Sequence, residues 1–210
     1  MPDVGCHHSA LGPNAAPVGR IRAELLQPRD KPLLFVDIDG VLSLFGFDPS
    51  AVPARCSWHQ VDGIVHLLSH DAAEHLHALD GLYEVVWCSG WKDRANDHLP
   101  HVLRLGPYPH LTFGNSPGHW KLEAVRQHAQ DRPLAWVDDD LNDAVRAWAA
   151  RRAAPTLLLE TAPASGLTAA HAERLRAFAR ALGSTGSEAR VSPSGRTPDE
   201  GTSPPGRAFP

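Results

Sequence analysis

The fold of this chain is decided by the stretch Leu33-Leu-Phe-Val-Asp37-Ile-Asp39-Gly-Val41. Its first four residues are apolar, as is typical of a strand buried on both faces of a parallel sheet. Two aspartates follow directly, and Gly40 then permits a tight turn. Both carboxylates are therefore expected at the carboxyl end of a buried strand, where open α/β sheets bind their ligands.

The rest of the chain alternates short apolar runs with segments of helical period. This alternation predicts an α/β fold, a Rossmann-like three-layer sandwich with a central, mainly parallel sheet. The expected strands are Leu33–Val36, Glu84–Trp87, Leu111–Phe113, Leu134–Val137 and Thr156–Leu159. The expected helices are Asp71–Leu79, Asp93–Leu103, Trp120–Gln130, Leu141–Arg151 and Ala169–Leu182. We expect Asp71 to cap the first of these helices, with Glu74 as its capping-box partner.

One segment, from Phe45 to His66, breaks the alternation because it carries Gly, Pro and Asp but little helical period. We expect a small hairpin or flap beside the end of the first strand. The segment is too short for a large cap domain, so the site should be open. An open site favours a bulky substrate, such as the end of a macromolecule.

Composition sets the limits of the folded domain. The chain has 210 residues, 42% of them hydrophobic, which suits one buried core with flanking segments. Residues 1–30 are rich in Pro, Gly and Ala, and we expect a poorly ordered extension there. Residues 31–183 form the expected domain. The Gly-, Ser- and Pro-rich residues 184–210 have too few apolar side chains to fold and should be a disordered tail.

Charge and cysteine content narrow the class of protein. A formal charge of −4 gives no overall attraction to nucleic acid or an anionic membrane. Cys6, Cys56 and Cys88 lie far apart, as is typical of free thiols in a reducing compartment. The sequence has neither the pattern of a secretory signal nor a membrane-spanning run. We therefore expect a cytoplasmic protein with no membrane partner and no evident obligate protein partner.

The aspartate pair has the spacing that acid–base and nucleophilic chemistry needs. Residues i and i+2 of an extended segment point the same way, so Asp37 could attack phosphorus while Asp39 handles the proton of the leaving group. A turn or helix cap is one alternative. A calcium loop is another, but its further ligands are missing after Gly40.

A second acidic cluster, Asp138-Asp139-Asp140, ends the apolar run Leu134–Val137. Adjacent carboxylates at a strand end repel one another, and a hard cation such as Mg²⁺ relieves that repulsion. Asp140 is explained equally well as the N-cap of the next helix. The cap explains Asp138 poorly.

Two further positions supply what a phosphate group needs. Ser89 and Gly90 follow the run Glu84–Trp87 and offer a hydroxyl and backbone N–H groups. Lys121 opens a helix and offers a compact positive charge. Each is unspecific alone, because such residues are usually a turn serine and a solvated lysine, so their order along the chain carries the inference.

This order of residues resembles the haloacid dehalogenase (HAD) superfamily. More narrowly, the chain is similar to its bacterial Swiss Army Knife RNA repair-like branch over about residues 31–182. The segments that carry the narrower likeness are Trp87-Cys-Ser-Gly-Trp91, Trp136-Val-Asp-Asp-Asp140 and Gly166-Leu-Thr168.

The resemblance implies a hydrolase, specifically an Mg²⁺-dependent phosphomonoester phosphatase with a HAD-like domain over residues 31–183. Asp37 would form an aspartyl-phosphate and Asp39 would be the general acid and base. Ser89, Gly90 and Lys121 would bind the phosphate. The metal would be bound by Asp37, Asp39 (through its carbonyl), Asp138 and Asp139. With an open site, the phosphorylated substrate would be a nucleic-acid end or another bulky phosphate ester. One alternative is a nucleic-acid end-processing phosphatase of RNA or DNA repair, and another is a non-catalytic module that binds phosphate or metal.

Several other patterns have competing interpretations. Cys88 and Arg94 have the Cys-x5-Arg spacing of cysteine phosphatases, but the residues between them are not small. The histidines have no complete zinc-ligand spacing. Some side chains near the flap are suited to stacking on a base or contacting backbone phosphates, although packing explains the aromatic ones as well. These side chains are Trp58, Trp91, Trp120, His119, Lys92, Arg94 and Arg104.

Overall fold

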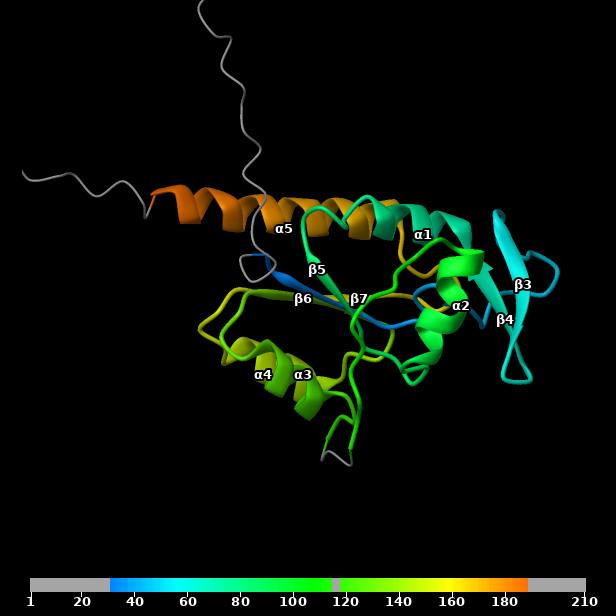
Figure 1. The fold of residues 1–210 in the computed structure, drawn as a ribbon, viewed down its shortest axis with the longest axis horizontal. Helices are drawn as coiled ribbons and strands as arrows, with labels where there is room; N and C mark the ends of the chain where they lie inside the picture. The colour runs from blue at the N-terminus through cyan, green and yellow to red at the C-terminus, as the bar shows by residue number, and fades with distance from the viewer. Residues whose placement is uncertain (1–30, 115–117, 189–210) are drawn as a thin grey trace, which may run out of the picture.

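The computed structural model describes residues 31–114 and 118–188, and Figure 1 shows how their helices and strands are arranged. The expected N-terminal extension, residues 1–30, lies outside the described residues, as does the part of the expected tail from 189 to 210. None of the described helices is both long enough and apolar enough to cross a membrane.

The central sheet is parallel and has four strands in the order β5-β1-β6-β7. Their bounds are β1 Leu33–Val36, β5 Glu84–Trp87, β6 Leu134–Asp138 and β7 Thr156–Glu160. Val36 at the end of β1 is level with Trp87 of β5 and with Val137 of β6. The chain leaves β1 toward β5 and later returns to the other side of β1. The carboxyl end of β1 is thus the switch point at which such sheets bind ligands.

Helices cover both faces of this sheet, which confirms the predicted three-layer α/β fold. Their bounds are α1 His70–His77, α2 Arg94–Val102, α3 Leu122–Ala129, α4 Asp143–Ala150 and α5 Ala169–Glu188. Figure 1 shows α1 and α5 on one face and α3 and α4 on the other. Leu34 and Val36 of β1 pack in the hydrophobic core beneath α1 and α5. Leu33 and Phe35 pack in the core on the opposite face, beneath α3 and α4. This alternation, with both sides buried, explains the unbroken apolar run of β1.

The predicted flap is a small antiparallel sheet in the order β2-β4-β3. Its strands are β2 Ser43–Leu44, β3 Cys56–Val61 and β4 Ile64–Ser69, and β4 leads directly into α1. The hairpin of β3 and β4 stands at the α2 end of the molecule (Figure 1). Within residues 31–114 and 118–188 there is no larger cap.

One expected strand is absent. The segment Leu111–Phe113 forms no strand. A single parallel bridge joins the residue before it, His110, to Trp87 at the end of β5. Pro107 and Pro109 precede the segment, and a proline has no backbone N–H to donate to a ladder. The predicted strand is therefore wrong.

Both predicted acidic helix caps are also wrong. Ser69 caps α1 through a hydrogen bond from the Ala72 N–H, and Asn142 caps α4 in the same way. Asp71 and Glu74 instead form ion pairs with Arg55. Helix α5 also continues to Glu188, so the first residues of the predicted tail, 184–188, are helical.

Candidate functional site

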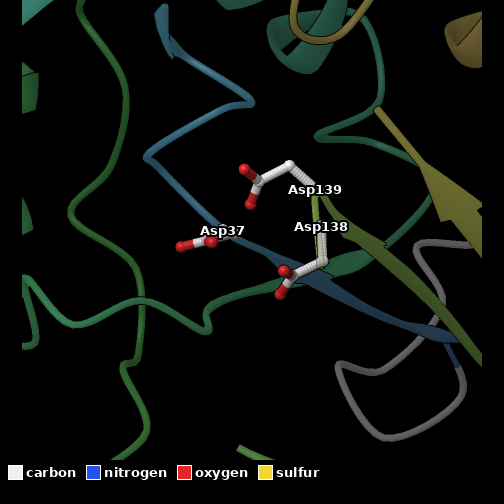
Figure 2. A group of neighbouring side chains, drawn as sticks. All are labelled: Asp37, Asp138 and Asp139. Atoms are coloured by element: carbon white, nitrogen blue, oxygen red, sulfur yellow. The ribbon is translucent and has the colours of Figure 1, made fainter. Parts of the chain in front are cut away.

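Three carboxylates meet at the carboxyl edge of the central sheet. Asp37 follows β1, Asp138 is the last residue of β6, and Asp139 comes directly after it (Figure 2). Each offers one oxygen, and these oxygens lie within 4.8 Å of one another. Among the residues that the structure describes, no other group of three acidic, histidine or cysteine ligands is this close.

Gly40 lets the two loops approach closely. A Cβ atom at this position would lie 2.5 Å from Cγ of Asp139, and the backbone φ of +72° also favours glycine. The hydroxyl of Thr161, just after β7, donates a hydrogen bond to the Gly40 carbonyl at 2.8 Å. The turn after β1 is thereby fixed against the ends of β6 and β7, and Asp139 has room beside Asp37.

Lys121 lies between two of the carboxylates. Its Nζ is 2.6 Å from Oδ2 of Asp37 and 2.7 Å from Oδ2 of Asp138. The lysine side chain is only 3% exposed, so this ammonium is not a solvated helix lysine. Lys121 stands directly before α3, far along the chain from both aspartates. The fold thus buries the positively charged side chain of Lys121 next to the three carboxylates.

Asp138 is held by further donors. The indole Nε1 of Trp136 donates to Oδ2 at 3.0 Å, and the backbone N–H of Asp140 donates to Oδ1 at 3.1 Å. Oδ1 of Asp37 accepts from the N–H of Ile38 at 2.7 Å. The two buried carboxylates are therefore fixed in orientation by the residues around them.

The cluster carries more negative than positive charge. Burial raises the pKa of Asp37 to about 7, and the charge of Asp138 adds to that rise although Lys121 opposes it. Burial would lower the pKa of Lys121, but Asp37 and Asp138 raise it overall. Burial and the neighbouring Asp138 also raise the pKa of Asp139. Three carboxylates facing one ammonium form an oxygen-only ligand set that suits a hard divalent cation.

Asp39 is placed differently from Asp37. Its side chain is 47% exposed and does not join the group of three carboxylates. The indole Nε1 of Trp91 donates to Oδ2 of Asp39 at 3.0 Å. Nδ1 of His66, on β4 of the hairpin, lies 3.4 Å from Oδ1. Asp37, Asp138 and Asp139, three of the four residues expected at the metal, have their carboxylates in one group, and the carboxylate of Asp39 lies outside it. This agrees with the expectation that Asp39 would contribute its backbone carbonyl and not its side chain.

The expected phosphate-binding residues border this cluster. The Cys88 N–H donates to the Val36 carbonyl, which keeps the loop after β5 beside the end of β1. Ser89 is buried in this loop, and its hydroxyl oxygen accepts a long hydrogen bond from the Trp91 N–H at 3.5 Å. A Cβ atom on Gly90 would lie 3.8 Å from the Trp120 ring.

The Trp120 ring lies beside the Lys121 ammonium, at the border of the carboxylate cluster. The Trp120 side chain is 43% exposed, its ring meets Phe113 edge-on, and the Lys121 ammonium lies 4.9 Å from its centre. His119, by contrast, is buried and cannot stack on a base. Nδ1 of His119 accepts from the Lys121 N–H, so Nε2 carries the proton and donates to the Asp140 carbonyl at 2.9 Å. His119 therefore ties the start of α3 to the loop after β6.

The cysteine-phosphatase interpretation fails on geometry and charge. Cys88 is completely buried, and burial raises the pKa of its thiol well above the ordinary value. A thiolate nucleophile needs the opposite shift. Arg94, the expected phosphate ligand of such a site, forms an ion pair with Asp62 at 3.1 Å.

Asp37→Asn tests the electrostatics of the cluster. Because the folded-state pKa of Asp37 is raised from 3.8 to about 7, the folded protein holds a proton that the unfolded chain has already released. The contribution of Asp37 to the free energy of unfolding is fully present below about pH 4 and is lost as the pH rises through about 7. In EDTA, the unfolding free energy of the wild type minus that of Asp37→Asn should fall by about 2 to 4 kcal/mol from roughly pH 4.5 to 7.5.

Urea unfolding at several pH values measures this difference. Asp97→Asn, at an exposed position on α2, is the matched control and should give no such slope. A difference that stays constant with pH for Asp37→Asn would contradict the electrostatic description of the cluster.

No protein-family model matches this chain, and neither does any curated protein. The chemistry of the side chains at the ends of β1, β5 and β6 is therefore the basis on which a function can be assigned.

Proposed function

We propose that the chain is a phosphatase, an Mg²⁺-dependent phosphomonoester hydrolase with Asp37 as its nucleophile. The observation that carries the proposal is the buried Lys121 ammonium between Asp37 and Asp138, with Asp139 beside them. Hydrolysis of a phosphate ester needs a nucleophile, positive charge for the phosphoryl oxygens and a proton donor for the leaving group. This edge of the sheet offers all three once a divalent cation is bound.

The metal would be held by Asp37, Asp138 and Asp139. The fit rests on their oxygen-only ligand set and on the negative charge that Lys121 leaves unbalanced. A bound Mg²⁺ would supply charge that stabilises the phosphoryl oxygens as the transition state forms.

In the first half of the proposed reaction, Asp37 attacks the phosphorus atom in line with the ester oxygen. The bond from Asp37 to phosphorus forms as the bond from phosphorus to the ester oxygen breaks. Asp39 gives its proton to the departing oxygen, so the product alcohol leaves neutral. The more exposed position of Asp39, two residues beyond the buried nucleophile, suits a group that must exchange protons with water.

In the second half, the aspartyl-phosphate on Asp37 is hydrolysed. Asp39, now a carboxylate, takes a proton from water, and the resulting hydroxide attacks phosphorus. The bond between Asp37 and phosphorus breaks, inorganic phosphate leaves, and Asp37 and Asp39 regain their starting protonation states. Lys121, Ser89 and the Gly90 backbone are the proposed ligands of the phosphoryl oxygens throughout.

Within the class of phosphate esters, the position of Trp120 favours a nucleotide or a nucleic-acid end as the substrate. The half-exposed Trp120 ring lies close to Gly90 and to the Lys121 ammonium, and we expect the group esterified to the phosphate to lie beside it. An indole in this position can stack on a base of any sequence. No cap larger than the hairpin covers this edge of the sheet within the described residues, which is compatible with a bulky substrate.

Loss of the nucleophile tests the reaction. With Mg²⁺ present, Asp37→Asn should lower kcat on an aryl phosphate by at least about 10³-fold, because an amide cannot form the acyl-phosphate. EDTA should abolish wild-type turnover and added Mg²⁺ should restore it. Asp97→Asn is again the control. Turnover that survives Asp37→Asn would overturn the nucleophile assignment, and Mg²⁺ binding without turnover on a broad phosphate panel would favour a non-catalytic module.

Removing the Trp120 indole tests the substrate class. Trp120→Ala should raise KM for nucleotides and oligonucleotides about tenfold, the equivalent of about 1.4 kcal/mol of stacking, with little change for glycerol phosphate. Trp58→Ala removes an exposed tryptophan from β3 of the hairpin and is the matched control. Equal increases for glycerol phosphate would argue against a stacked base, and equal effects of the two variants would argue against Trp120 as the residue that stacks.

A further inference from the structure

We infer that His66 and Trp91 are positioning residues that aim the Asp39 carboxyl at the leaving group, which makes the hairpin a working part of the acid–base machinery. The inference rests on the proposed phosphatase function and goes beyond it. It assigns a role to the hairpin, which would otherwise only border the site.

Asp39 needs such support because of its place in the fold. Its side chain is 47% exposed, whereas that of Asp37 is 8% exposed, and it precedes the tight turn at Gly40. An exposed carboxylate in a turn ordinarily rotates among several side-chain conformations. General acid catalysis needs one of them, with an oxygen within hydrogen-bond reach of the departing atom.

The two oxygens of Asp39 have different partners. Trp91, in the loop after β5, donates its indole N–H to Oδ2 at 3.0 Å. His66, on β4, places Nδ1 3.4 Å from Oδ1, a long contact of the kind that tightens when a substrate is bound. Rotation of the carboxyl group would break both interactions at once.

The partners are themselves fixed. The His66 and Trp91 rings meet edge to face with their centres 4.6 Å apart. Nδ1 of His66 is also 3.0 Å from the hydroxyl oxygen of Ser43 on β2, and the Gly40 N–H donates to the Ser43 carbonyl. Trp91 packs against the buried core. Hence the turn after β1, the loop after β5 and the hairpin converge on one carboxyl group.

Two nearby histidines, His59 on β3 and His70 at the start of α1, do not share this role. Nε2 of His59 and Nε2 of His70 both contact the hydroxyl of Ser57, at 2.7 and 3.0 Å. His59 is the cross-strand partner of His66. It therefore offers a matched control on the same hairpin.

The test uses two substrates that differ in their need for an acid. The p-nitrophenolate ion leaves without protonation, whereas an alkoxide from ethyl phosphate must be protonated as it departs. Trp91→Phe keeps the ring but removes the N–H, and His66→Ala removes the imidazole. Each should lower kcat/KM on ethyl phosphate about 10- to 100-fold and kcat/KM on p-nitrophenyl phosphate less than about threefold. The ratio kcat/KM is compared because it reports only the steps up to departure of the alcohol, and the later hydrolysis of the aspartyl-phosphate is common to both substrates.

His66→Asn, whose amide nitrogen can take the place of Nδ1, should recover part of the activity on ethyl phosphate that His66→Ala loses. His59→Ala should affect neither substrate. If His66→Ala does not fold, as judged by urea unfolding, Trp91→Phe decides the outcome alone.

The results that would contradict the positioning role differ from those that would contradict the phosphatase function. Equal losses on both substrates, or no loss on ethyl phosphate, would overturn the positioning role while leaving the phosphatase assignment intact. Absence of wild-type turnover on both substrates would overturn the proposed function and the positioning role with it.

Discussion

The arrangement of this site depends on the burial of one ammonium between two carboxylates. Removing Lys121, Asp37 and Asp138 from water costs several kcal/mol per ion, and only close pairing and further hydrogen bonds offset that cost. The pairing is present at 2.6 and 2.7 Å, and Trp136 and two backbone N–H groups donate the additional hydrogen bonds. Such a cluster is a poor source of stability, so its presence is easier to explain by chemistry than by folding.

The contrast between Asp37 and Asp39 shows how one short segment can supply two chemical roles. Both carboxyls follow the same strand, yet Asp37 is buried beside Lys121 while Asp39 lies at the surface between an indole and an imidazole. Environment rather than residue type separates a nucleophile from a proton carrier. In the proposed reaction, the sheet fixes the first residue and the hairpin fixes the second.

Much of this could be predicted because it is local. The apolar runs of β1 and β5 have the predicted bounds. The rule that ligands bind at the carboxyl ends of strands predicted that Asp37 and Asp138 would lie close together, and the order of residues along the chain added Lys121. Other features depend on distant partners. Arg55 pairs with Asp71 and leaves the cap to Ser69, and His66 reaches Asp39 only through the register of β2, β3 and β4. No local pattern carries that information.

Chemical trapping of the covalent intermediate is the most direct test of the phosphatase assignment. The protein would be mixed with Mg²⁺ and a phosphate ester, quenched in acid and reduced with borohydride, which converts an aspartyl-phosphate to homoserine. Mass spectrometry of the peptide that contains Leu33–Val41 should then find Asp37 converted, and only when substrate was present. Turnover without conversion of Asp37, or conversion of a different aspartate, would contradict its role as the nucleophile.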